Sequence, residues 1–274
     1  MKKYLFPLGM WLLFEAIAVT LWLVADNIFY LFNFSYIGSC IALGLLLYTK
    51  KFPYARQVVQ FAVGLYMLVY LGILSRENMQ IEGFWYFLFL GVFQAAVIHY
   101  AVAKLFGPLL FGRGWCGYAC WTAMVLDLLP YKKPAEPRKR IGWIRYILFA
   151  ASLAFVGGLF LLGVKQLDDI MFWSFIIGNA VYYIVGIALA FAFRDNRAFC
   201  KYICPITVFL KPASYFSLVR VRVDEAKCVS CGKCKKVCPM NVDMTNNARS
   251  RTNGTECILC NACVDACPKD ALKL

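Results

Sequence analysis

Apolar residues run in long, nearly unbroken blocks through the chain before residue 195, and charged positions fall mainly between these blocks. Each block approaches the ~20 residues that a helix needs to cross a hydrocarbon core. Because lipid cannot satisfy backbone polar groups, blocks of this kind indicate membrane-spanning helices. We therefore expect about six transmembrane helices, at 5–25, 29–48, 58–74, 84–106, 141–164 and 170–193.

The composition supports the same class. Hydrophobic residues make up 62% of the 274 residues and charged residues only 16%, whereas a soluble domain is about half apolar and about a quarter charged. We expect a mainly α fold with two parts. A polytopic membrane helical bundle occupies 1–220, and a small domain with a different pattern occupies 221–274.

Most basic residues lie on one side of the expected spans. The loops after the first, third and fifth spans carry only Arg76 and Lys165 as basic residues, in a chain with a net charge of +14. By the positive-inside bias, both termini then face the cytoplasm and the bundle lies in the cell membrane. Nucleic-acid binding is not expected, because the basic residues flank spans and no nucleic-acid module accompanies them.

The segment 221–274 contains two cysteine runs with the spacing of a bacterial two-cluster ferredoxin. Both read Cys-x2-Cys-x2-Cys-x3-Cys-Pro. In this spacing three cysteines bind one [4Fe-4S] cluster and the fourth reaches the neighbouring cluster. The tail is therefore expected to be a small α+β ferredoxin domain that carries electrons. The expected ligands are Cys228, Cys231, Cys234 and Cys267 for cluster 1, and Cys257, Cys260, Cys263 and Cys238 for cluster 2.

Two other uses of these eight cysteines are disfavoured. Structural zinc sites typically use two separated ligand pairs rather than three close cysteines and a distant Cys-Pro. A disulfide framework does not suit a segment that is expected to face the reducing cytoplasm. The iron–sulfur interpretation is the most specific one that the sequence offers.

Four further cysteines form a pattern that occurs twice. Residues 113–120 and 197–204 each place an arginine first, then an aromatic residue, a cysteine, a tyrosine and a second cysteine. This repetition indicates an internal duplication whose copies emerge on the same, cytoplasmic side. If each loop is helical, its two sulfurs lie one turn apart on one face. The cysteines are Cys116 and Cys120 in the first loop, and Cys200 and Cys204 in the second.

Several chemistries suit these four thiols. They are enough for a third iron–sulfur cluster or for a soft metal ion such as Cu(I). A redox-active dithiol within each loop is an alternative. A further alternative is that these cysteines are buried residues that only pack in the core. Arg113, Arg197 and Lys201 would stabilise the negative charge of a thiolate or cluster.

Ionisable residues within the expected spans are candidates for a quinone or proton site. His99 is the only histidine, so a haem held by two histidines of this chain is excluded. It either contacts a quinone carbonyl or packs in the bundle. Glu15 must pair or face a cavity, because a buried charge in a span is costly.

Two polar segments carry weaker expectations. Asp127, after the first loop, is expected to face water or to pair with a nearby lysine. The insertion 242–256 between the two cysteine runs is rich in Asn, Thr, Arg and Ser. It is expected to be a surface loop where a partner docks.

The spans, the two Cys-x3-Cys loops, Cys204-Pro205 and the two-cluster tail resemble the NapH/NosR/RdxA-type membrane polyferredoxins from about residue 80 onward, in the compact NapH-like form. The resemblance implies an electron-transfer subunit that works between a quinol pool or cytoplasmic donor and a partner reductase, or that serves metalloenzyme maturation. The chain departs from the family at Trp121, where the family usually has proline after the second cysteine.

Three functions follow from these patterns. The first is a membrane-bound electron relay between a cytoplasmic donor, such as a soluble ferredoxin or flavoprotein, or quinone, and a partner redox enzyme. The second is a metallocentre assembly factor or copper reductase, and the third is a redox sensor. No phosphate-binding glycine loop, nucleophile elbow or zinc-hydrolase motif occurs, so we expect no stand-alone bond-making chemistry.

Overall fold

The computed structural model describes residues 2–92, 96–248 and 254–274, and they form a mainly helical chain. Among these described residues, five helices are long and apolar enough to cross a membrane, at Tyr4–Ala25, Ile28–Thr49, Ala55–Leu74, Ile144–Leu161 and Leu167–Phe193. They correspond to α1 (Lys2–Ala25), α2 (Ile28–Thr49), α3 (Ala55–Leu65) with its π-helical continuation η1 (Tyr66–Leu74), α9 (Ile144–Leu161) and α10 (Leu167–Phe193).

The expected span at 84–106 is interrupted, and the described chain there forms two helical pieces. The first is α4 (Ile81–Phe89). Gly91, with a φ of +70°, follows it and donates its N–H to the carbonyl of Leu88, and such a left-handed residue ends a helix. Residues 93–95 lie outside the described chain. The second piece runs without a break through α5 (Ala96–Tyr100), η2 (Ala101–Phe106) and α6 (Gly107–Phe111).

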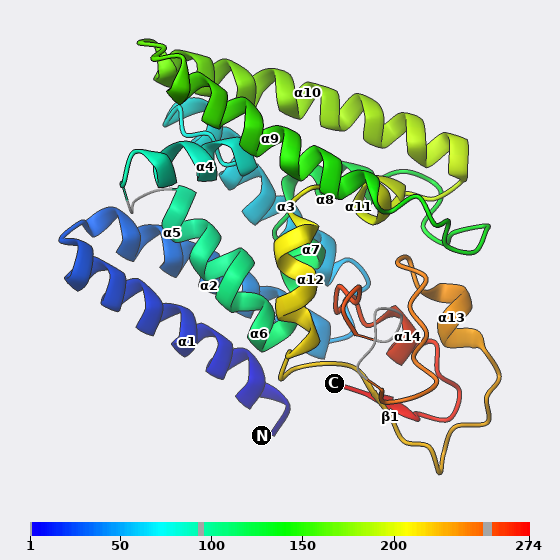
Figure 1. Cartoon of the computed structure of the whole chain (residues 1–274). Helices are drawn as coiled ribbons and strands as arrows, with labels where there is room; N and C mark the ends of the chain where they lie inside the picture. The colour runs from blue at the N-terminus through cyan, green and yellow to red at the C-terminus, as the bar shows by residue number, and fades with distance from the viewer. Residues whose placement is uncertain (1, 93–95, 249–253) are drawn as a thin grey trace.

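Four short helices gather at one end of the long helices. Figure 1 shows them between the bundle and the tail, on the side where both termini lie. They are α7 (Gly114–Tyr118), α8 (Trp121–Leu126), α11 (Ala198–Tyr202) and α12 (Thr207–Tyr215). The cysteine loops of the duplication are therefore built at helix ends that face the tail.

The tail combines short strands and short helices. Strands β1 (Arg222–Val223) and β2 (Leu272–Lys273) pair antiparallel, with Val223 opposite Leu272. The helices are α13 (Lys233–Val237) and α14 (Ala262–Asp265). One apolar core joins the tail to the loops, since Cys116 and Cys200 belong to the same buried cluster as Cys238, Ile258 and Leu259.

Candidate redox site

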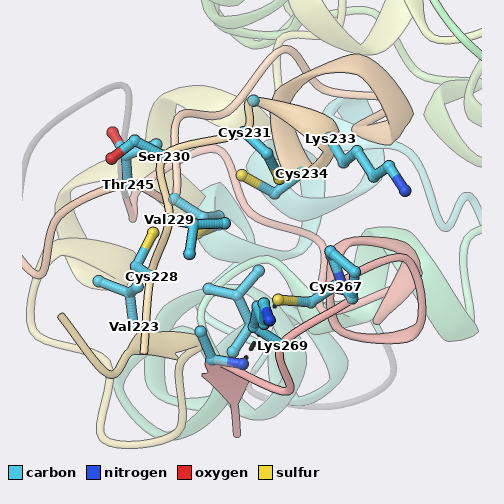
Figure 2. Close-up of a pocket in the computed structure, with 15 residues that line it drawn as sticks. Val223, Cys228, Val229, Ser230, Cys231, Lys233, Cys234, Thr245, Cys267 and Lys269 are labelled. Atoms are coloured by element: carbon cyan, nitrogen blue, oxygen red, sulfur yellow. Dashed lines mark hydrogen bonds between the residues drawn. The ribbon is translucent and has the colours of Figure 1, made fainter. Parts of the chain in front are cut away.

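Two cavities in the tail divide its eight cysteines into two sets. One is lined by Cys228, Cys231, Cys234 and Cys267, together with Val229, Lys233 and Lys269 (Figure 2). The other is lined by Cys238, Cys257, Cys260 and Cys263, together with Met240 and Ile258. These sets are the two that the crossed ferredoxin spacing predicts. The ligand assignment remains a prediction, and the grouping supports it.

The backbone around both sets has the same unusual turns. Two residues after the first cysteine of each run, the backbone has a left-handed φ. It is 51° at Ser230 in the first run and 53° at Leu259 in the second. Gly232 and Asn261, two positions later, have φ values of 71° and 59°. Non-glycine residues adopt this conformation only where the surrounding structure holds them there. Both runs are therefore folded into matching concave cradles.

Backbone amides bond to the fourth cysteine of each run. The N–H of Val242 donates to Sγ of Cys238 at 3.3 Å, and the N–H of Ala271 donates to Sγ of Cys267 at 3.4 Å. Hydrogen bonds of this kind stabilise a negatively charged sulfur and tune the potential of an iron–sulfur cluster. The two cradles therefore suit iron–sulfur ligation, in which each sulfur is a thiolate.

The two sets differ in their surroundings. Cys231 of the first set is exposed, whereas Cys238 and Cys263 of the second are buried. The second set rests on the first Cys-x3-Cys loop, where the Tyr118 hydroxyl donates to the carbonyl of Leu259 at 3.0 Å. We call the set around Cys231 the distal set and the set around Cys238 the proximal set.

Glu256 anchors the proximal set to the helical part of the chain. Its buried carboxylate pairs with Arg113 and with Arg138 at 2.9 Å. Lys211 lies 3.2 Å and Arg145 3.6 Å from the same carboxylate. Burial alone would raise the pKa of Glu256, but these four cations lower it to about 2. The insertion was expected to be a surface loop, yet Glu256 at its end is buried; residues 249–253 lie outside the described chain.

The two Cys-x3-Cys loops are cross-linked by their own arginines. Arg197 of the second loop donates from Nη1 to the carbonyl of Cys116 at 3.0 Å. Arg113 of the first loop donates from Nη2 to the carbonyl of Cys200 at 3.3 Å. Both guanidinium groups are buried. The duplication thus forms a pair in which each copy holds the cysteine backbone of the other.

The four loop thiols influence one another electrostatically; Cys116 and Cys200 are buried, and Cys120 and Cys204 are half-buried. Burial raises the pKa of Cys204, and the neighbouring Cys200, Cys116 and Cys120 raise it further. Burial likewise raises the pKa of Cys200 to about 11, although Arg197 opposes this. A reactive dithiol requires an accessible thiol with a lowered pKa. Cys200 and Cys204 have raised pKa values instead.

In the described part of the chain, no three His, Cys, Asp or Glu side chains are grouped closely enough to hold a single metal ion. This holds for the loop cysteines and for the tail cysteines alike.

The loops are surrounded by an excess of buried positive charge. The described buried acids are Asp195 and Glu256, and the largely buried Asp127 pairs with Arg197; the buried basic side chains are Lys104, Arg113, Arg145, Arg197, Lys201 and Lys211. A buried charge is costly unless an opposite charge compensates it. A thiolate-ligated cluster is a negatively charged group that would supply this compensation.

Asp127 and Gly117 make contacts that were not foreseen from the sequence. Asp127 does not face water or bind lysine; it pairs with Arg56 at 2.6 Å and with Arg197. Gly117 lies against the backbone carbonyl of Ile258, so any β-carbon would clash there. The equivalent residue in the second loop is Lys201, whose ammonium group bonds to Asp195 at 2.7 Å and to Asn241. The two loops therefore contact opposite ends of the proximal set.

His99 and Glu15 are not brought together. His99 is buried with no hydrogen-bond partner for its ring nitrogens among the described residues, and its ring packs edge-on against Trp115 at 4.9 Å. Glu15 accepts a hydrogen bond of 2.7 Å from Ser35 of α2. Glu15 therefore has a packing partner, whereas His99 contacts the first cysteine loop through Trp115.

A larger cavity of about 1050 Å³ opens between α4, α9 and α10. Its walls include Phe155, Ile170 and Trp173, and its polar lining includes Gln80, Glu82 and Tyr182. Within the described chain, Nε2 of Gln80 and Oε2 of Glu82 are buried without a hydrogen-bond partner. Sequence reasoning missed this site; its signal was the polar pair at the start of the fourth apolar block.

Comparison with known families matches the cysteine segments separately. Residues 220–268 match a 4Fe-4S dicluster domain. Residues 93–135 and 172–223 both match a 4Fe-4S binding domain, and each of these segments contains one Cys-x3-Cys loop. The chain therefore contains ferredoxin-type 4Fe-4S regions together with membrane-type helices.

Curated relatives are similar over limited regions. An uncharacterised protein of Methanocaldococcus jannaschii, MJ0749, is 25% identical over 49% of this chain and 54% of its own length. The methylamine utilization ferredoxin-type protein MauN of Paracoccus denitrificans is 25% identical over 53% of this chain and 54% of its own. The putative electron transport protein YccM of Escherichia coli is 31% identical over 28% of this chain and 21% of its own.

The chain thus spans about half, or less, of the length of these relatives. No solved structure matches it. The family matches and the names of the relatives support an iron–sulfur protein with a role in electron transfer.

Proposed function

We propose that this chain is a membrane-bound electron-transfer subunit whose three sets of cysteines form one relay. Docking of the proximal set onto both Cys-x3-Cys loops, through Tyr118, Glu256 and Lys201, is the observation that carries this proposal. The order is the distal set, the proximal set and then the loops. A [4Fe-4S] cluster accepts and donates one electron at a time, and the contacts of the proximal set with both loops support this order.

The proposal includes a third [4Fe-4S] cluster held by Cys116, Cys120, Cys200 and Cys204. Three observations support it: the electrostatically connected thiols, the surplus of buried cations and the family match of both loops. Arg113 and Arg197 hold the two loops in register. Because a cluster ligand must be a thiolate, the nearby cations offset the cost of its charge.

We further propose that the long helices lie in the cell membrane with the loops and tail on the cytoplasmic side. The excess of basic residues at that end supports this orientation. The piece from Ala96 to Phe111 would complete the fourth crossing. The interrupted form of this crossing fits a site near it, because irregular backbone is tolerated at membrane depth where it borders protein or a cavity.

The cavity between α4, α9 and α10 is the best candidate for exchange with quinone. Nε2 of Gln80 can donate to a quinone carbonyl, and the carboxylate of Glu82 can accept from a quinol hydroxyl. Tyr182 lies on the cavity wall, and its ring packs at 5.0 Å against the ring of Phe199 in the second loop. This tyrosine links the cavity to the loops. It replaces the expected quinone site at His99 and Glu15 in our proposal.

The test is a single-turnover reoxidation experiment. The protein is purified anaerobically, reduced with dithionite and mixed with a water-soluble quinone, while EPR follows the tail clusters. We expect the double variant Cys116→Ser/Cys200→Ser to keep the tail signals and to lose at least tenfold in reoxidation rate. An unchanged rate with intact tail signals would remove the loops from the relay. Zinc without acid-labile sulfide in the wild-type protein would overturn the whole proposal.

A further inference from the structure

The two ferredoxin runs carry very different charges. The first, 228–238, contains Lys233, Lys235 and Lys236. The second, 257–267, contains no basic residue and one acid, Asp265. Both runs form the same type of cradle, so holding a cluster does not require these lysines. Their presence on one run calls for a separate explanation.

The lysines lie on the side of the tail that faces away from the helices. Helix α13 has no buried residue, whereas α14 buries Cys263. Figure 1 shows α13 at the outer edge of the molecule and α14 closer to the short helices. Lys233 and Lys269 border the distal cavity in Figure 2. The distal set is thus the one that both reaches the surface and is bordered by basic residues.

Two of the tail's lysines are neutralised locally and four are not. Lys235 pairs with Asp243 at 2.6 Å, and Lys227 lies 3.5 Å from Asp224. Among the described residues, the other four exposed lysines form no ion pair, and Asp270 and Glu225 are the exposed acids nearest to them in sequence. We call these four the lysine face: Lys233, Lys236, Lys269 and Lys273.

Apolar residues accompany the lysine face. Val229, which is 58% exposed, and the exposed Pro268 line the distal cavity beside Lys233 and Lys269. A small apolar area with a charged rim is typical of transient electron-transfer contacts, which are steered by electrostatics more than by buried area. A single-sign field of this kind raises the rate of encounter with an oppositely charged partner.

We propose that the lysine face docks a soluble electron-carrier protein with an acidic surface. This inference rests on the proposed relay and assigns its cytoplasmic partner. In each encounter one electron crosses between the carrier and the distal site, so one is oxidised as the other is reduced. The exposed Cys231 marks where the electron crosses, because the proximal set is covered by the helical part of the chain.

The experiment uses the full chain in nanodiscs of zwitterionic lipid, with its iron content measured. The probe is a strongly acidic plant-type ferredoxin, reduced photochemically and mixed in a stopped-flow instrument. We expect the second-order rate constant to fall steeply as salt rises from about 0.01 M to about 1 M, since the Debye length shrinks from about 30 Å to about 3 Å.

Charge reversal supplies the specific test. We expect Lys233→Glu/Lys269→Glu to lower the rate constant at low salt by at least tenfold, with the difference vanishing at high salt. Lys236→Glu/Lys273→Glu, whose residues do not line the cavity, should lower it by at least threefold without altering the cluster environment. The matched control is Lys132→Glu/Lys133→Glu, two exposed lysines between α8 and α9, which should leave the rate constant unchanged.

The outcomes separate this inference from the relay itself. Equal rate constants for the wild-type protein and both lysine-face variants would overturn the docking proposal, even if dithionite still reduced the clusters. It would also be overturned if the control pair slowed transfer as much, or if the variants lost only binding to anionic lipid vesicles. Absence of clusters in the wild-type protein would instead overturn the proposed function.

Discussion

Arg197 donates a hydrogen bond of 3.0 Å from Nη1 to the carbonyl oxygen of Cys116, in the other Cys-x3-Cys loop. The same guanidinium group lies 3.8 Å from Sγ of Cys200 and pairs with Asp127. One side chain therefore joins both loops and the helix that follows the first. Since the reciprocal bond from Arg113 repeats this arrangement, the loops form one unit.

Arg197→Gln should destabilise this unit. Removing one partner of a buried ion pair costs up to about 3–5 kcal/mol, and Asp127 would keep only its pair with Arg56. We expect a lower apparent Tm in thermal unfolding and less iron per chain. The matched control is Arg76→Gln, because Arg76 pairs with Asp169 at 2.7 Å on the surface. An exposed pair contributes about 0–1 kcal/mol, so equal losses in the two variants would contradict the assignment.

Glu256→Gln should loosen the tail from the helical part of the chain. The substitution keeps the shape of the side chain but leaves Arg113 and Arg145 buried without their anion. We expect faster proteolysis between the two parts, and slower electron transfer from the tail to added quinone. Asp270→Asn, also in the tail, is the control because its side chain is exposed. An effect of the same size in both variants would show that Glu256 is not the anchor.

The pKa of Glu256 predicts how this docking depends on pH. The pKa of Glu256 in the folded protein is lowered to about 2. The carboxylate therefore stabilises the docking of the tail fully at any pH above the ordinary pKa of a glutamate. This stabilisation is lost only as pH falls towards about 2. We therefore expect the proteolysis rate at the junction to be constant between pH 5 and pH 8. A rise in cleavage near pH 5 that Glu256→Gln abolishes would contradict the lowered value.

Gly117→Ala should push the proximal set away from the first loop. A β-carbon there would clash with the carbonyl of Ile258. We expect at least a tenfold loss in the rate of electron transfer between the tail and quinone, with unchanged tail EPR signals. Gly158→Ala is the control, because a β-carbon on this residue of α9 meets no atom within 4 Å. Equal rates in both variants would exclude this close approach as a functional contact.

Gln80→Leu should weaken quinone exchange specifically. The substitution removes the unpartnered amide that lines the cavity while keeping the side chain's approximate volume. We expect a several-fold higher quinone concentration for half-maximal reoxidation. The iron content and the rate of electron transfer from the dithionite-reduced protein to ferricyanide should not change. If the quinone concentration for half-maximal reoxidation stays at the wild-type value, quinone binds elsewhere.

The sequence predicted the chemistry of the tail better than its placement. The cysteine spacing gave the two sets that the cavities contain, because ligand spacing is a local property of the chain. Glu256 looked like part of a solvated loop, since its partners Arg113 and Arg138 are more than a hundred residues away. Such long-range pairs leave no periodic signal in a single sequence.

The helices show the same contrast between local and long-range information. Five apolar blocks are long helices, because hydropathy and length decide that outcome. The block at 84–106 is interrupted. Gly91 was the local sign of a helix end, but the length of the apolar block favoured a single helix. The cavity beside Gln80 and Glu82 could not be foreseen, since α9 and α10 form its other walls.

The iron and acid-labile sulfide content of anaerobically purified protein distinguishes two clusters from three. We expect about twelve iron atoms per chain in the wild-type protein, for three [4Fe-4S] clusters. We expect about eight in Cys116→Ser/Cys200→Ser, with the EPR signals of the tail unchanged. About eight iron atoms in both proteins would contradict the third cluster and the relay built on it.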